Sequence, residues 1–319
     1  MCSSDLSLIR ARDGSYYLAW LSDRDGNDDI YVMRSRDGQH WDAPVRVTTN
    51  ADPDWYPSLV QSRDGRFHVV WFRPMTVQPF YRHVYANSSD DGLTWNPQNE
   101  VQVTSGVTDD WAPMMLETSG GELLVYFSSQ ARGTSGTSDL YLSRSTDQGA
   151  SWPAPTMLAT ASDPAQMEVF PYVVERAAGD LVMVFVRYAP SGGSNYFDST
   201  TDLFRATSSD GVSWTGVFAI TNDDASGFVD SIPSLYASAD RSRWFILWTS
   251  TGPTAPATPK ILDLALGDAY PAAALDATAA HGMLGYSAHA VATDTPRLYL
   301  GVWVHDIGSK RLEWQLFAR

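Results

Sequence analysis

A hairpin motif that occurs four times is the feature that most constrains the fold of this chain. One copy, Ser145-x-Asp147-x-Gly149-x-x-Trp152, follows a strand in which Leu140 and Leu142 alternate with Tyr141 and Ser143. The Ser and Asp side chains of such a segment can hydrogen-bond the turn backbone, and Gly supplies a position with positive φ. The indole can return onto the apolar face of the sheet. Four copies of one turn predict a chain built from repeats.

The other three copies of the motif end at Trp41, Trp95 and Trp214. The second copy has the spacing of the third when Asp90 is taken as its turn acid, and the first and fourth are one residue shorter. The four Trp residues lie roughly 54 to 62 residues apart, a period typical of a repeated supersecondary unit. The motif therefore marks one position in each repeat.

A second landmark, a proline that opens an apolar strand, keeps the same period. After each proline come a turn and a strongly apolar strand, and a third strand then leads into the hairpin motif, which a short fourth strand follows. Four strands per repeat are typical of a β-propeller blade. The prolines are Pro57, Pro113, Pro171 and Pro233.

Two further blades are predicted without the full set of landmarks. Segments 16–20 and 298–304 read as the second strands of a first and a last blade, and 261–266 replaces the hairpin motif in the fifth. The sequence therefore predicts an all-β, six-bladed β-propeller with four-stranded antiparallel blades. It would occupy residues 1–319 as a single domain, at about 53 residues per blade.

The charge balance excludes some classes of partner. The chain has 22 Lys and Arg against 37 Asp and Glu, a net charge of −15, which argues against binding to nucleic acid or an anionic membrane. No apolar run approaches the ~20 residues that cross a bilayer. The six His residues show no metal-ligand spacing, and the acids at 25–29 lack the calcium-loop pattern. We therefore predict no metal and no cofactor, and a monomer.

The first residues are unusual. Met1 to Leu6 resemble the translation of a common sequencing adaptor, and we expect these six residues to be an artefact joined to a truncated gene. A secretory signal would have been lost with the true N-terminus. We expect a secreted, cell-surface or periplasmic protein.

The hairpin motif resembles the Asp box, or bacterial neuraminidase repeat, of the sialidase superfamily. In that family the boxes are structural and lie on the propeller face opposite the active site. The resemblance therefore implies that function lies at the other rim, where the first strand of each blade begins. It also implies that four acids form turns and take no part in catalysis, namely Asp37, Asp90, Asp147 and Asp210.

The resemblance also implies catalytic residues. Tyr286, within Gly285-Tyr286-Ser287, is similar to the family's nucleophile segment, and Glu168 lies close to where the family has its glutamate partner. The proton donor of the family falls in a loop that here contains Asp25, Asp28 and Asp29. Tyrosine nucleophiles are a recognised exception among glycosidases.

The carboxylate-binding arginines of the family are poorly matched. The first would fall within residues 1–6, and Leu203 stands at the second position, with Arg187 and Arg205 nearby. Lys260 corresponds to the third, and a lysine cannot form the bidentate fork of an arginine. A neutral sugar is therefore expected as substrate in preference to sialic acid.

An acid stands three residues before each landmark proline, and repeats place such positions at equivalent radii. We expect these acids to converge on the central funnel and raise one another's pKa. Trp55 and Trp111 each follow one of them, and an acid beside an indole suits a sugar. The alternative is that the acids only cap strand-start turns. They are Asp54, Asp110, Glu168 and Asp230.

Two functions remain open from the sequence. One is an exo-acting glycoside hydrolase of sialidase-like architecture, with a glycan or glycoconjugate as its partner. The other is a propeller without catalysis that binds carbohydrate or protein through the same mouth. A fold alone does not decide between them.

Overall fold

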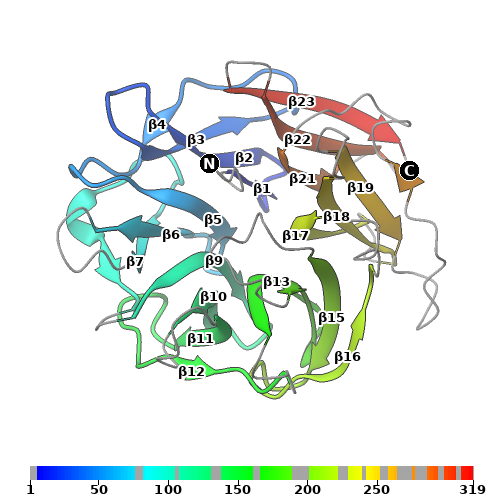
Figure 1. The fold of residues 1–319 in the computed structure, drawn as a ribbon. Helices are drawn as coiled ribbons and strands as arrows, with labels where there is room; N and C mark the ends of the chain where they lie inside the picture. Colours follow the sequence, from blue (N-terminus) through cyan, green and yellow to red (C-terminus); the bar gives the residue numbers. More distant parts are fainter. Residues whose placement is uncertain are drawn as a thin grey trace.

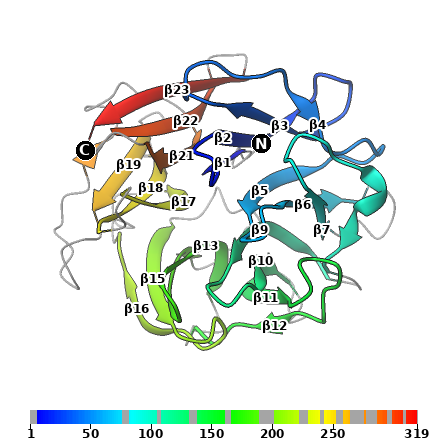
Figure 2. The same ribbon diagram turned by 180° about the vertical axis from the view of Figure 1, so that it is seen from behind.

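The computed structural model describes residues 6–75, 82–104, 108–130, 138–160, 166–188, 201–221, 229–238, 242–251, 258–263, 275–276, 286–293, 298–306 and 310–318. Its strands form antiparallel sheets placed around a central axis, as the two opposite views show (Figures 1 and 2). Each sheet is built from strands that follow one another in the chain. This is a β-propeller.

The strands of a blade run from the axis outward. The innermost strands are β1 (Leu6–Arg10), β5 (Trp55–Gln61), β9 (Asp110–Glu117), β13 (Met167–Ala177), β17 (Val229–Ala237) and β21 (Tyr286–Ala292). The second strands are β2 (Tyr16–Ser22), β6 (Phe67–Pro74), β10 (Leu123–Ser129), β14 (Asp180–Tyr188), β18 (Trp244–Thr251) and β22 (Leu298–Asp306).

The third and fourth strands complete the blades. The third strands are β3 (Asp29–Ser35), β7 (Arg82–Ser89), β11 (Asp139–Ser145), β15 (Asp202–Ser208), β19 (Thr258–Asp263) and β23 (Lys310–Ala318). The fourth strands are β4 (Val45–Arg46), β8 (Val101–Gln102), β12 (Thr156–Met157), β16 (Thr215–Ala219) and β20 (Leu275–Asp276). A 3₁₀ turn, η1 (Pro97–Asn99), precedes β8.

The number of four-stranded blades differs from the prediction. Five sheets have four strands, whereas β21, β22 and β23 form a sheet of three in the described part of the chain. The predicted six four-stranded blades are therefore corrected to five. The sixth sheet ends with β23 (Lys310–Ala318), and no fourth strand pairs with it among the described residues.

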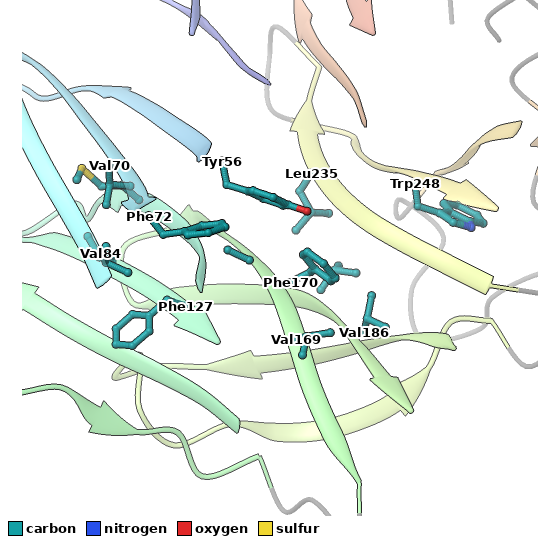
Figure 3. Packing of buried hydrophobic residues seen from close by; sticks show 14 of the residues in the cluster. Tyr56, Val70, Phe72, Val84, Phe127, Val169, Phe170, Val186, Leu235 and Trp248 are labelled. Carbon is teal, nitrogen blue, oxygen red and sulfur yellow. The ribbon is translucent and has the colours of Figure 1, made fainter. Parts of the chain in front are cut away.

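The second strands form the centre of the core because each blade is packed between two others. All of β10 and nearly all of β6 are buried, which explains their continuous apolar runs. The largest cluster of buried side chains joins blades two to five (Figure 3). In it Tyr56 of β5 stacks on Phe170 of β13, with ring centroids 6.1 Å apart.

The hairpin motif has the predicted turn chemistry. In the fourth copy the Asp210 carboxylate accepts hydrogen bonds from the backbone N–H groups of Val212 and Ser213, both at 2.8 Å. Ser208 Oγ accepts from Gly211 N at 2.9 Å, and Trp214 Nε1 donates to the Gly211 carbonyl at 3.2 Å. These bonds satisfy the turn within a few residues of chain.

The second copy of the motif is corrected by one residue. Asp91, not Asp90, accepts from the backbone of Leu93 at 2.8 Å, and Ser89 is its serine. Asp90 is exposed and pairs with Arg66 at 3.1 Å. The second copy thus has the short form of the first and fourth, and the third alone has an extra residue, Gln148, with a φ of 59°.

The antiparallel order gives each blade two distinct ends. The innermost strands begin at one end, which we call the strand-start rim, and the connections between third and fourth strands lie at the other, which we call the hairpin rim. The prediction that the motif lies opposite the start of the innermost strands is confirmed. No helix in the described residues could cross a membrane.

Candidate functional site

A strained bulge interrupts four of the innermost strands beside the axis. The residue before each landmark proline has a left-handed backbone, and the pairing register shifts there. Such a conformation is costly for a residue other than glycine, by about 1–3 kcal/mol, and strain of this kind gathers at functional sites. A bulge also tolerates the proline that follows, which lacks an N–H. The left-handed residues are Tyr56 (58°), Ala112 (50°), Phe170 (55°) and Ile232 (55°).

The bulges line a central opening of about 440 Å³ that is open to solvent. Its wall consists largely of the four prolines and the residues beside them. Two hydroxyl groups of the wall are used between blades: Ser7 Oγ accepts from Leu59 N, and Ser58 Oγ accepts from Met115 N, both at 3.0 Å. The axis is therefore an apolar passage with its aromatic rings stacked across it.

The acids before the landmark prolines do not share this opening. The side chains of Asp54, Asp110 and Glu168 are buried, at 0%, 2% and 1% exposure. Asp54 accepts from Trp71 Nε1 and Arg73 Nε, both at 2.7 Å. The expectation of one acidic funnel is therefore wrong for these three acids.

The same arrangement recurs in the next two blades. Asp110 accepts from Ser129 Oγ at 2.5 Å and from Thr108 Oγ1 at 2.9 Å. Glu168 accepts from Arg187 Nη2 at 2.5 Å and from Thr160 Oγ1 at 2.6 Å. Each acid thus binds a side chain at the end of the second strand of its own blade. Asp230 lies in β17, and its side chain is outside the described part of the structure.

Burial shifts the pKa of two of these acids. It raises the pKa of Asp54, against hydrogen bonds from Arg73 that lower it. Burial likewise raises the pKa of Asp110, against the hydrogen bond from Ser129. The expected direction is confirmed, but the cause is removal from water and not mutual repulsion.

The three candidate proton donors lie in three different environments. Asp29 is buried and binds Arg46 at 2.5 Å, and burial raises its pKa. Asp28 is half-buried and accepts from Trp55 Nε1 at 2.9 Å. Asp25 is exposed and accepts from the Tyr31 hydroxyl at 2.5 Å. Asp25 and Asp28 remain within reach of solvent.

The remaining residues implied by the resemblance are placed by strand register. Tyr286 opens β21 opposite Val304, just before the register shift, which is the position of Trp55 in β5. Its side chain lies outside the described part of the structure. Lys260 in β19 pairs with Trp248 and is half-buried. Arg187 is held by Glu168, and so is not a vacant carboxylate clamp.

Trp55 and Trp111 hold equivalent places but have different neighbours. Each follows a buried acid and lies against the third strand of the preceding blade. Trp55 donates to Asp28 of that blade, whereas Trp111 meets Arg82, whose guanidinium lies 4.9 Å from the centre of its ring. Arg82 Nε in turn binds Asp109 Oδ1 at 2.6 Å.

Arg82 and Asp109 were not among the site residues predicted from the sequence. Asp109 stands beside a predicted site acid, so the doubled acid before Trp111 was the available signal. Nothing near Arg82 in the sequence indicates its partner, because the two residues lie in different blades.

Four threonines at equivalent places in four blades were also not predicted from the sequence. Thr48 Oγ1 accepts from Ile30 N at 3.0 Å, Thr104 Oγ1 from Val84 N at 3.0 Å and Thr221 Oγ1 from Leu203 N at 2.9 Å. The fourth member, Thr160, donates to Glu168. Thr48 and Thr221 also donate to the buried acids Asp29 and Asp202, which belong to third strands. The recurrence of a threonine before each repeat acid was the signal that could have found them.

Three arginines at the strand-start rim are matched by carboxylates. Arg73 binds Asp54 and also Glu100, the latter at 2.6 Å. Glu168 holds Arg187, and Asp109 holds Arg82 through two nitrogens. These three cations are therefore neutralised within the protein. Among the described residues no group of His, Cys, Asp and Glu is placed to hold a metal ion.

Comparison with known proteins shows the fold. No protein-family model matches the chain. An uncharacterized protein of Mycobacterium tuberculosis, found in two strains, is 31% identical over 117 residues, which is 33% of this chain and 38% of that relative. The chain thus matches less than half of the length of these relatives.

Solved structures match along almost the whole chain. An alpha-L-arabinanase of Penicillium chrysogenum complexed with arabinobiose has a TM-score of 0.69 at 16% identity and covers 98% of this chain and 92% of its own. The alpha-L-arabinofuranosidase Arb93A of Fusarium graminearum gives 0.71 at 16%, with the same coverage. A protein of unknown function from Dyadobacter fermentans gives 0.69 at 17%, covering 98% and 93%. The predicted propeller is confirmed, and membership of the sialidase superfamily stays a prediction.

Proposed function

We propose that this protein is a glycoside hydrolase that acts on a neutral glycan at its strand-start rim. Two of the structural neighbours are named as arabinan-degrading enzymes, and one of them holds arabinobiose. The aromatic residues Trp55 and Trp111 lie at this rim beside carboxylates, an arrangement that suits sugars.

The neutralised arginines are the observation that carries the preference for a neutral sugar. An anionic sugar needs a cation, and Arg73, Arg82 and Arg187 are each bound by a carboxylate of the protein. To bind a sialoside, such a pair would have to open and leave a buried carboxylate without its partner, which is costly. A neutral sugar imposes no such cost.

The proposed chemistry keeps the roles that the sequence suggested. Tyr286 is the nucleophile and Glu168 its partner, held in place by Arg187 and Thr160. Asp28 is the proton donor, because it is partly exposed and accepts a hydrogen bond from Trp55, an aromatic residue of the rim. Glu168 takes the phenolic proton as Tyr286 attacks the anomeric carbon, and Asp28 protonates the leaving oxygen. Water, with Asp28 as its base, then releases the sugar from the tyrosine, as in the retaining scheme.

A second function is favoured by one observation. The three described acids of the repeat are buried and hydrogen-bonded, as structural groups are. A propeller that binds a glycan without cleaving it would retain these acids because they stabilise its fold. Both functions use the same rim, so turnover separates them.

A panel of chromogenic aryl glycosides, neutral ones and a sialoside, tests the proposal. We expect turnover of at least one neutral glycoside and none of the sialoside. Tyr286→Phe and Glu168→Gln should each lower kcat by about a hundredfold or more. Binding of a glycan without turnover by any form would replace the enzyme with the binding function, and clear turnover of the sialoside would overturn the neutral preference.

A further inference from the structure

The crevice between the second and third blades contains a partly exposed ion pair beside an aromatic ring. Arg82, the first residue of β7, binds Asp109 through its backbone N–H at 3.0 Å and through Nε at 2.6 Å. The side chains are 29% and 21% exposed, so solvent reaches both. The guanidinium lies over the ring of Trp111.

This crevice adjoins a residue that lines the central opening. Trp111 meets Phe170 edge to face, with ring centroids 5.3 Å apart, and Phe170 lines the opening. A ligand in the opening therefore has the Trp111 ring as its next surface, and the Arg82–Asp109 pair beyond it.

The equivalent crevice between the first and second blades lacks these properties. There Trp55 Nε1 is bound to Asp28, so the indole donor and one carboxylate oxygen are used by each other. Between the second and third blades Arg82 occupies the place that Asp28 has in the first crevice. A guanidinium group has no hydrogen-bond acceptor. Trp111 Nε1 is accordingly buried with no hydrogen-bond partner. Such groups are rare in folded proteins and call for a ligand or water oxygen.

An arginine and an aspartate side by side offer donors and acceptors at adjacent points with little net charge. A pair of neighbouring hydroxyl groups has the matching requirement, since each hydroxyl both donates and accepts. An anion would be repelled by Asp109 and a cation by Arg82. The aromatic ring beside the pair can cover the apolar face of a sugar.

We infer that Trp111, Arg82 and Asp109 form a subsite for a vicinal diol of a neutral sugar. Asp109 accepts a hydroxyl proton, Arg82 donates to the oxygen of its neighbour, and the indole N–H gains an acceptor. This inference rests on the proposed function and adds to it the residues that select the sugar.

Calorimetry with a fixed panel of probes provides the test: arabinobiose, xylobiose, galactobiose and mannobiose. The tightest binder among them is then compared in wild type, Asp109→Asn and Trp111→Phe, with circular dichroism to verify folding. We expect Asp109→Asn to weaken binding at least tenfold and Trp111→Phe about fivefold. Glu122→Gln is the matched control, because it removes a similarly exposed ion pair with Arg144 away from the site, and it should bind as wild type does.

A probe that lacks one hydroxyl of the diol sharpens the result. Methyl arabinofuranoside and its 2-deoxy derivative should differ at least tenfold in wild type and by less than twofold in Asp109→Asn. If wild type binds a glycan and both variants bind it equally well, the subsite is wrong while the proposed function stands. If wild type neither binds nor cleaves any neutral glycan, both fail.

Discussion

The hairpin rim and the strand-start rim satisfy their polar groups in different ways. At the hairpin rim Asp210 finds its partners within three residues, in Ser208, Val212 and Ser213. At the strand-start rim Asp54 and Glu168 find their arginine partners nineteen residues away, on a neighbouring strand. Arg82 and Asp109 are twenty-seven residues apart and belong to different blades.

This difference separates turn hydrogen bonds that form locally from ion pairs that need the assembled propeller. The turn bonds of a hairpin form as soon as the hairpin does. The ion pairs at the other rim exist only after blades have packed, and their burial makes each partner depend on the other. The two largest expected losses of stability, one at each rim, should therefore differ in whether a second substitution restores the stability.

Breaking a buried pair at the strand-start rim should have the largest effect. Arg187→Met leaves Glu168 buried without a cation and should lower the free energy of unfolding by about 3–5 kcal/mol. Chemical denaturation measures it. The double variant Glu168→Gln, Arg187→Met should recover most of the loss, since no uncompensated charge remains. A single variant as stable as wild type would show that Glu168 is not held by this pair.

Removing a buried indole at the hairpin rim should lower the free energy of unfolding by a similar amount. No second substitution should restore this loss. Trp214 is 3% exposed, and Trp214→Ala should lower the free energy of unfolding by about 3–5 kcal/mol. The half-buried Trp152 is the internal control, and Trp152→Ala should cost clearly less. Equal losses measured by denaturation would mean that burial does not explain the role of the motif.

The two rim tryptophans offer a smaller and sharper contrast. Trp55→Phe removes the N–H that binds Asp28 and should cost about 1 kcal/mol. Trp111→Phe removes an N–H that has no partner, so its stability should match wild type or exceed it. Thermal melts of both variants measure the difference. A larger loss for Trp111→Phe would contradict the unpartnered indole.

The smallest expected effect is a pH dependence of the hairpin rim. Hydrogen bonds from the backbone of Ser213 and Val212 lower the pKa of Asp210 to about 2. A lowered pKa in the folded state contributes stability above the unfolded value near 4, and this contribution is lost as the pH falls toward 2. Because Asp210 lies at the surface, solvent screening keeps the effect small.

Melting temperatures at pH 7 and pH 3 test this for wild type and Asp210→Asn. The variant should melt lower at pH 7, and the gap should narrow at pH 3. Buried Asp54 has the opposite sign, because its raised pKa favours the folded state as the pH falls. A gap that widens on acidification would contradict the turn bonding of Asp210.

The repeat made most of the fold predictable. Four hairpin motifs and four prolines gave the second strands of the blades to within a few residues, and the structure has them at β6, β10, β14 and β18. The sixth sheet was less well predicted because it carries neither landmark in full. The one-residue error at Asp90 arose because two serines and two aspartates stand in a row there, and spacing cannot choose between them.

The candidate site was predictable only in part. The recurrence of an acid before each proline was real, and it placed Asp54, Asp110 and Glu168 at the same radius. It did not show that each carboxylate turns toward the end of its own second strand. That direction follows from the register of two strands, which periodicity along one strand does not contain.

The sequence by itself determined the repeat, the turns and the identity of the two rims, because turn chemistry and strand alternation act between residues a few positions apart. Only the tertiary structure decided which carboxylate meets which arginine, and why Trp55 is bound where Trp111 is not. Those contacts join residues of different strands and blades, so their partners are set by register and packing. The physical reason is the range of the interaction: local bonds can be inferred from neighbours in sequence, and bonds between blades require the closed ring.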